Sequence, residues 1–301
     1  MTSTVDQSLP TWPAGVSLLL GLGAQKAGTT WLHDRLKAHP DCHAFPIKEL
    51  HYFNTVSGLS RLGFTLTAAG RNALLRKGDK AAADRVSQLA DLFHAQPQTH
   101  QDYVDLVTEG LEPGSVALDI TPAYALLDDA QFEQVAAMDP VRFLYIMREP
   151  VARFWSNIRM ILNAPGKDQP DFEPDAQALL DHTLDHRDAP MSAAAFARSD
   201  YLQALEKLER HVPAQRRLVL FFEDLFTEHT MNRIWAFLDV SPRPLTATEP
   251  RLEGVQASMR PDQIERLKDV FWPQYDAICA RFGDAVPDAW HARFAPEVMA
   301  A

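Results

Sequence analysis

The sequence has few cysteines and no long apolar run. Its two cysteines, Cys42 and Cys279, are too few for a disulfide framework and fit no metal-ligand spacing, as is typical of a reducing cytoplasm. The longest apolar run, Val16 to Leu22, is too short to span a bilayer, and no basic residue precedes it. We therefore expect a cytoplasmic protein without a signal peptide or membrane span, in which this run forms a buried strand.

Basic residues are also fewer than acidic ones. The chain carries 29 Lys and Arg against 40 Asp and Glu, a formal net charge of −11. This balance, and the lack of a stripe of alternating aromatic and basic residues, argue against a nucleic-acid partner. Any pocket for an anion must therefore be built by a few individually placed cations.

Four apolar, β-compatible segments alternate with helical patterns along the chain. They read SLLLGLG, SVALDI, RFLYIM and RLVLFF. This alternation favours an α/β protein with a parallel sheet covered by helices on both faces. No segment resembles an interdomain linker, so we expect one domain over residues 1–301, with a core at about 16–240 and a C-terminal helical extension over 241–301.

Local signals predict where some elements begin and end. The first helix should begin near Thr29 and stop before Pro40, and a late helix should kink or end at Pro273. Residues 163–175 are dense in proline and acid, which predicts a mobile surface loop.

The stretch GLGAQKAGTTWL follows the first strand pattern. Gly23 and Gly28 have the separation of a phosphate-binding loop, but the lysine is Lys26, inside the loop, where a nucleoside-triphosphate loop has one after the second glycine. A strand, a glycine turn and a helix start present backbone N–H groups to an anion. For the glycine pair alone, a tight turn with a helix cap is the commoner explanation.

A second anion-binding pattern lies over a hundred residues later, in FLYIMREPVARFWSNIRM. A buried strand leads into Arg148-Glu149-Pro150 and then a helix that carries Ser156. An arginine there can bind a phosphate through two parallel hydrogen bonds. Taken alone, an exposed arginine in a turn is at least as good an explanation.

Together the two segments resemble the sulfotransferases that use 3′-phosphoadenosine 5′-phosphosulfate (PAPS), and QKAGTTWL resembles their 5′-phosphosulfate loop. The resemblance implies a P-loop-like three-layer α/β/α sandwich with a central parallel sheet. It also implies that Lys26 contacts the phosphate and the bridging oxygen, stabilising the charge that develops as the S–O bond breaks. The other loop residues implied to bind the donor are Ala27, Gly28, Thr29, Thr30 and Trp31.

In the same family, an arginine followed eight residues later by a serine binds the 3′-phosphate, and Arg148 and Ser156 have this spacing. Glu149 stands where aspartate is commoner, and the Glu223 segment LVLFFEDL resembles a late strand whose acids organise a turn. Arg260, in QASMRPDQ, is expected either to close over the donor or to cap the late helix. Such transfer requires no metal, and we assign none, although His182 and His186 lie four apart.

The segment PIKELHYFN predicts the group that takes the acceptor proton. In an extended chain Glu49 and His51 would point to one face and Lys48 to the other. The segment resembles the Glu-x-His-x-Phe of heparan-sulfate-type carbohydrate sulfotransferases, which implies Glu49 as base with His51 as support or substitute. Without that resemblance, an ion-paired surface glutamate and a half-buried histidine orienting the loop are the preferred explanation.

The segment LDITPAYAL resembles the Lys-Thr-Pro-Ala-Tyr of the same enzymes, but Ile120 replaces the lysine. Asp119, Thr121 and Tyr124 would then line the acceptor pocket, or form a strand end with a turn. The missing lysine weakens the link to a heparan-like acceptor more than the link to the donor.

The sequence thus predicts an enzyme, resembling bacterial members of the family, that transfers a sulfuryl group from PAPS to a hydroxyl of a sugar or other alcohol. The product would be adenosine 3′,5′-bisphosphate (PAP), and the partner a small-molecule or carbohydrate acceptor. One alternative is a nucleotide-dependent kinase or phosphotransferase, which would require a lysine after Gly28 and an acidic residue that binds magnesium. The other is a non-catalytic nucleotide-binding protein on the same fold.

Overall fold

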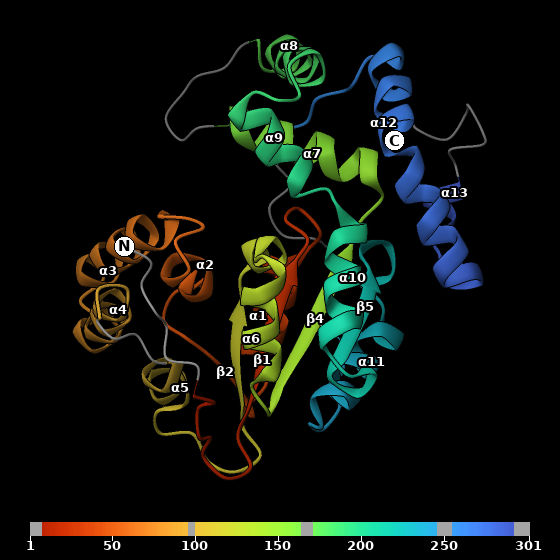
Figure 1. The fold of residues 1–301 in the computed structure, drawn as a ribbon. Coiled ribbons are helices and arrows are strands. Elements are labelled where there is room, and N and C mark those ends of the chain that lie inside the picture. Colours follow the sequence, from red (N-terminus) through yellow and green to blue (C-terminus); the bar gives the residue numbers. More distant parts are fainter. Residues whose placement is uncertain (1–7, 96–99, 164–170, 246–254, 292–301) are drawn as a thin grey trace.

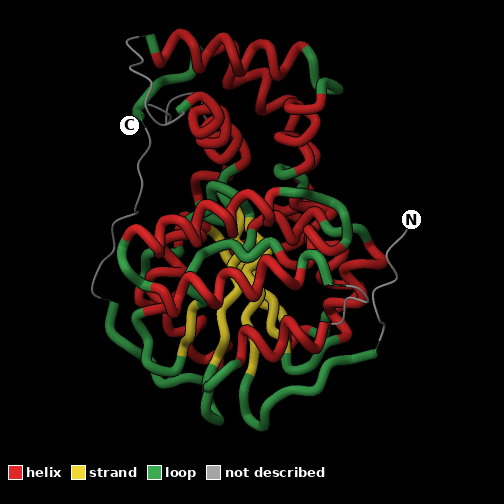
Figure 2. The backbone as a smooth tube through the Cα atoms, turned by 90° about the vertical axis from the view of Figure 1, so that its left-hand side faces the viewer, coloured by secondary structure: helices red, strands yellow, loops and turns green. Residues whose placement is uncertain are grey.

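A computed structural model describes residues 8–95, 100–163, 171–245 and 255–291. Its centre is a parallel five-stranded sheet in the order β2-β3-β1-β4-β5. Helices lie on both sides of this sheet (Figures 1 and 2), so the predicted P-loop-like three-layer sandwich is confirmed. The strands are β1 (Ser17–Gly23), β2 (Cys42–Ala44), β3 (Val116–Ile120), β4 (Val141–Met147) and β5 (Arg217–Phe221).

Helices connect the strands and continue after the last one. The α-helices in the described ranges are α1 (Thr29–Lys37), α2 (Tyr52–Val56), α3 (Leu62–Arg76), α4 (Lys80–Leu92), α5 (His100–Thr108), α6 (Asp129–Ala137), α7 (Pro150–Leu162), α8 (Phe172–Asp185), α9 (Pro190–Ala197), α10 (Tyr201–His211), α11 (Glu228–Leu238), α12 (Pro261–Phe282) and α13 (Asp288–His291). No helix in these ranges combines the length and apolarity needed to cross a membrane.

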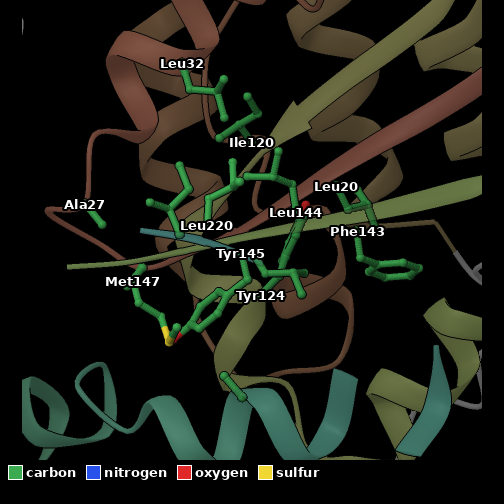
Figure 3. Close-up of a cluster of buried hydrophobic side chains, with 14 of the residues drawn as sticks. Leu20, Ala27, Leu32, Ile120, Tyr124, Phe143, Leu144, Tyr145, Met147 and Leu220 are labelled. Carbon is green, nitrogen blue, oxygen red and sulfur yellow. The ribbon is translucent and has the colours of Figure 1, made fainter. Parts of the chain in front are cut away.

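The strands are buried because helices cover both faces of the sheet. Leu18, Leu19 and Leu20 of β1 are 0% exposed, and β3 is buried along its whole length. Figure 3 shows side chains from β1, β3, β4, β5 and α1 gathered in one apolar cluster. The four apolar segments of the sequence therefore became strands, as predicted. The three-residue strand β2 was missed, since it has no apolar run of its own.

All five strands run in the same direction, so their carboxyl ends share one edge of the sheet. The segments after β1, β2 and β4 carry the predicted site residues, and α7, α8, α9 and α12 lie beyond this edge (Figure 1). Crevices outside the carboxyl ends of the strands are where open α/β sheets bind ligands.

Two local expectations were wrong in part. The helix α12 runs through Pro273 and does not end there, because Phe271 and Tyr275 are both buried on either side of the proline and hold the helix in place. Residues 164–170 of the predicted loop lie outside the described residues, but 172–175 form the first turn of α8. Pro174 is tolerated there, and the neighbouring acids favour a helix N-terminus. The start of α1 at Thr29 was predicted correctly.

Candidate active site

The loop between β1 and α1 has the shape of an anion cradle. Gly23, Lys26 and Gly28 all have positive φ, at 127°, 70° and 78°. Gly28 is the N-cap of α1 and supplies no side-chain cap, so the first N–H groups of the helix are left for another acceptor. A Cβ on Gly28 would lie 2.6 Å from Leu225 Cδ2, so glycine is required there by both packing and φ.

Two arginines from the second motif hold this loop. Arg148 Nη1 donates to the carbonyl of Lys26 at 3.1 Å, and Arg153 Nη1 donates to the carbonyl of Gln25 at 3.3 Å. Arg153 is 0% exposed and also donates to Ser199 Oγ. Two motifs more than a hundred residues apart in the sequence therefore meet. The sequence analysis missed this role of Arg153, for which the only signal is its place in the first turn of α7.

The loop residues differ in what they offer a ligand. Ala27 is fully buried and its N–H donates to the carbonyl of Ala24 at 3.2 Å, so it shapes the loop. Trp31 is buried edge-on against Phe226. Thr30 is half-buried, and its hydroxyl accepts a hydrogen bond from Lys48 Nζ at 3.1 Å. The hydroxyl of Thr30 and the backbone at Gly28 are therefore the better-placed groups for an anion.

Positive charge gathers around Lys26. Burial lowers its pKa, and Arg148, Arg159 and Lys48 lower it further by repulsion. Ser156, one turn before Arg159 on α7, is 9% exposed. Cations that destabilise one another this way are stabilised by a bound anion, so the site suits a ligand with more than one negative charge.

The C-terminal helices attach beside Arg148. Glu149 caps α7 by accepting from the N–H groups of Val151 and Ala152, and it also accepts from Tyr275 of α12. Glu223 Oε1 accepts from the Glu149 N–H at 2.7 Å, and its Oε2 accepts from Trp290 Nε1 of α13 at 3.2 Å. Glu223 thus organises the structure, as the sequence analysis expected. Burial raises the pKa of Glu149 to about 7.

Arg260 precedes α12 as its N-cap and pairs with two acids. Its Nη2 lies 3.0 Å from Asp181 of α8 and 3.0 Å from Asp262. These ion pairs join the start of α12 to α8. A role of Arg260 in donor binding stays a prediction.

The predicted acid–base segment is built differently from an extended chain. Glu49 and His51 have φ of 61° and 53°, and His51 is the N-cap of α2. Lys48 Nζ lies 2.8 Å from Glu49 Oε1, and His51 Nε2 lies 3.5 Å from Glu49 Oε2. The expectation that Lys48 faces away from Glu49 was therefore wrong. The chain turns between β2 and α2, which brings all three side chains together.

Burial distinguishes the two candidate bases. His51 is 2% exposed, and its Nδ1 lies 3.1 Å from the amide nitrogen of Asn54. An amide N–H only donates, so Nδ1 accepts and the ring proton sits on Nε2, facing Glu49 at the long limit of a hydrogen bond. The Glu49 side chain is 33% exposed. Burial favours its neutral form, but the His51 hydrogen bond and the Lys48 charge outweigh this and hold the Glu49 pKa at about 2.

A buried network lies behind these residues. Asp119 is 1% exposed and accepts from the hydroxyls of Tyr103, Tyr124 and Thr121 at 2.8, 2.7 and 2.6 Å. The same tyrosine and threonine oxygens accept from the backbone N–H groups at the start of α2, Tyr52 to Tyr124 and His51 to Thr121. Of the two alternatives for Asp119, Thr121 and Tyr124, the structure has the strand end with a turn, since β3 ends at Ile120 and each of the three is 0–1% exposed. They position the α2 segment and do not line a pocket.

The position of the missing lysine also faces the core. Ile120 is 1% exposed, and its Cγ2 would lie 2.7 Å from a Cβ on Gly21. Lys48, from the segment before α2, is a described cation in contact with Glu49 instead.

Backbone strain singles out the same residues. Four non-glycine residues in the described ranges have positive φ, and three of them are Lys26, Glu49 and His51. Strained backbone of this kind is retained where the surrounding structure enforces it and clusters at functional sites. Among the described residues, no cluster of three or more His, Cys, Asp or Glu side chains is arranged to hold a metal. The rings of His182 and His186 stack with centroids 4.4 Å apart.

The fold is that of a P-loop-like α/β protein, with a strained loop after β1 and an arginine after β4 that donates to this loop. The chain belongs to the sulfotransferase family, whose sequence profile matches residues 19–244. Membership makes it a transferase and confirms the resemblance to sulfotransferases, whereas the resemblance to the heparan-sulfate branch stays a prediction.

The fold matches that of a solved sulfotransferase structure. A sulfotransferase from Alicyclobacillus acidocaldarius is 19% identical, with a TM-score of 0.61 over 93% of this chain and 100% of that chain. A sulfotransferase domain of the Synechococcus PCC 7002 olefin synthase is also 19% identical, with a TM-score of 0.47 over 89% of this chain and 98% of that chain. A search of curated proteins found no match. At these identities the likeness extends to the fold alone.

Proposed function

We propose that the protein transfers a sulfuryl group from PAPS to a hydroxyl acceptor, a sugar or other alcohol, and releases PAP. The observation that carries this proposal is that three separate segments are linked at one edge of the sheet. Arg148 donates to the Lys26 carbonyl, and Lys48 contacts both Glu49 and the Thr30 hydroxyl next to the loop. Family membership supports the reaction type. The cationic surroundings of Lys26 suit a donor with two anionic groups.

The donor supplies an activated sulfuryl group on a phosphate leaving group. The first N–H groups of α1 and the Thr30 hydroxyl hold the 5′-phosphate, since the helix start carries no side-chain cap. Lys26 stabilises the negative charge that develops on the leaving oxygen. Arg148 and Ser156 bind the 3′-phosphate, and Arg153 keeps the loop in shape through the Gln25 carbonyl.

Glu49 takes the proton from the acceptor hydroxyl. It is the more exposed of the two candidates, whereas the buried His51 ring faces it with Nε2 at 3.5 Å and turns its other nitrogen to Asn54. His51 therefore orients the carboxylate. The acceptor approaches from the side on which Glu49 meets the loop.

Calorimetric titration tests the proposal, with PAP, adenosine 5′-monophosphate and ATP–magnesium titrated in parallel. We expect PAP to bind more tightly than the monophosphate by about tenfold or more, because a second charge-assisted site is engaged. If ATP–magnesium binds and PAP does not, the kinase alternative replaces the proposal. If PAPS binds but a labelled-donor screen over alcohols yields no product, the protein is a non-catalytic nucleotide binder.

A further inference from the structure

Lys48 connects the acceptor side of the site to the donor loop. Its ammonium lies 2.8 Å from Glu49 Oε1 and 3.1 Å from Thr30 Oγ1, and the side chain is 20% exposed. Thr30 is in the first turn of α1, where the helix offers its N–H groups to an anion. An ammonium has three N–H donors, so these two contacts leave it one for a further acceptor. Lys48 therefore spans the gap between the proposed base and the proposed donor phosphate.

The charges around Lys48 are unequal on its two sides. On the loop side, burial lowers the pKa of Lys26, and repulsion by Arg148 and Arg159 lowers it further. On the other side, Glu49 is the carboxylate in contact with Lys48, and His51 lies behind it. Without a ligand, the Lys48 ammonium is attracted to Glu49 and repelled by the loop. A bound phosphosulfate would make the net charge on the loop side negative, so the loop side would then attract the Lys48 ammonium.

The pairing with Lys48 makes Glu49 a weak base. The His51 hydrogen bond and the Lys48 charge overcome the effect of burial and hold the Glu49 pKa at about 2, far below the range in which a carboxylate accepts a proton well at neutral pH. The general base of the reaction must therefore lose part of this stabilisation before or during transfer. Lys48 is the partner able to leave, because His51 is packed in place by Asn54 and α2.

We propose that Lys48 is a donor-responsive cation, which pairs with Glu49 in the free protein and moves onto the sulfuryl oxygens when PAPS binds. The inference rests on the proposed function and adds a residue to it. Lys48 then serves twice, stabilising the transferring group and freeing the Glu49 carboxylate for the acceptor proton.

The reaction step balances without a further reactant. The acceptor oxygen forms the new S–O bond while its proton passes to Glu49. The S–O bond to the 5′-phosphate breaks, and its electron pair stays on the phosphate oxygen beside Lys26. Lys48 stays protonated throughout and returns to Glu49 when the sulfuryl group leaves on the acceptor.

The test compares PAPS with PAP, which lacks the sulfuryl group, by calorimetry on the full chain without acceptor. We expect Lys48→Met to weaken the binding of PAPS by about tenfold or more and the binding of PAP by less than about threefold. The reason is that one charge-assisted contact is made to the sulfuryl group alone. Lys48→Arg should restore most of the PAPS affinity. Lys77→Met, the same change at an exposed lysine at the end of α3, is the matched control and should alter neither.

A double-mutant cycle with Glu49 tests the exchange itself. Glu49→Gln removes the competing charge, so PAPS should bind at least about threefold more tightly while PAP is unchanged, and the gain should vanish in Lys48→Met/Glu49→Gln. If Lys48→Met weakens the binding of both nucleotides equally, or leaves PAPS binding unchanged, the inference is overturned while the proposed function still stands. If the wild type binds neither nucleotide, the proposed function fails, and the inference fails with it.

Discussion

At Lys26, Glu49 and His51 the backbone adopts a left-handed conformation that costs a non-glycine residue about 1–2 kcal/mol. Long-range contacts stabilise this conformation, through Arg148 on the Lys26 carbonyl and through Thr121 on the His51 N–H. This backbone conformation sets the directions of the Lys26, Glu49 and His51 side chains, which differ from those in a regular helix or strand. Their roles in catalysis can be tested one residue at a time.

The first prediction concerns Glu49. Glu49→Gln should lower turnover by about 10²-fold or more, because it removes a general base, while PAP affinity stays within about twofold. Turnover is measured with labelled PAPS and an acceptor found by screening, and affinity by calorimetry. Glu206→Gln, at an exposed residue of α10, is the control. A comparable loss of PAP binding in Glu49→Gln would make Glu49 a structural residue.

The second prediction concerns Arg148, which faces both the loop and the proposed 3′-phosphate. Arg148→Ala should weaken the binding of PAP by about tenfold or more. It should weaken the binding of adenosine 5′-phosphosulfate, which lacks the 3′-phosphate, much less. Calorimetry with both nucleotides measures the ratio. Equal weakening would mean that the arginine acts only by holding the Lys26 carbonyl.

At the scale of elements, the site depends on how β1, the loop and α1 are joined. Gly28 has φ of 78°, and a Cβ there would meet Leu225 at 2.6 Å. Gly78 has φ of 81°, but a Cβ there meets nothing within 4 Å. The two glycines therefore share the conformational requirement and differ in packing and in their distance from the loop.

The third prediction uses this pair. Gly28→Ala should lower the melting temperature more than Gly78→Ala and abolish detectable PAP binding, because the added methyl displaces the loop. Gly78→Ala should lose only about 1 kcal/mol of folding stability, because alanine is strained at this positive φ, and it should bind PAP normally. Thermal unfolding and calorimetry on both variants provide the comparison. Normal PAP binding by Gly28→Ala would show that the loop does not hold the donor.

Elements were largely predictable from the sequence, because burial on both faces of a parallel sheet leaves continuous apolar runs. The strand β2 was not, since three residues form no pattern, and α12 continued through Pro273 because buried neighbours override a local helix breaker. The strand–turn–helix pattern around Lys26 was also readable, whereas the turn that brings Lys48 to Glu49 was not.

At the scale of the whole molecule, the C-terminal helices are tied to the motif that follows β4. Tyr275 of α12 donates to Glu149, and Trp290 of α13 donates to Glu223. Burial raises the pKa of both carboxyls, to about 7 for Glu149. The protonation of Glu149 therefore links the docking of α12 to the position of Arg148.

The fourth prediction follows from the direction of this shift. The fold favours protonated Glu149, so its contribution to stability is fully present below about pH 4.5 and is lost as pH rises through about 7. The melting temperature of the wild type should therefore fall, relative to Glu149→Gln, by a few degrees between about pH 5 and pH 8. Parallel melts of Glu206→Gln should follow the wild type. A constant difference between wild type and Glu149→Gln across this range would contradict the raised pKa.

The sequence by itself determined the sheet, the loop around Lys26 and the arginine after β4, because each is a local pattern of burial or turn chemistry. The tertiary structure decided which residues meet there. It placed Lys48 between Glu49 and Thr30, and it buried His51 and Ile120. It also brought Arg153 to the loop and the C-terminal helices to the motif after β4. Positive φ values and contacts between distant segments depend on the packed chain, so no local periodicity encodes them.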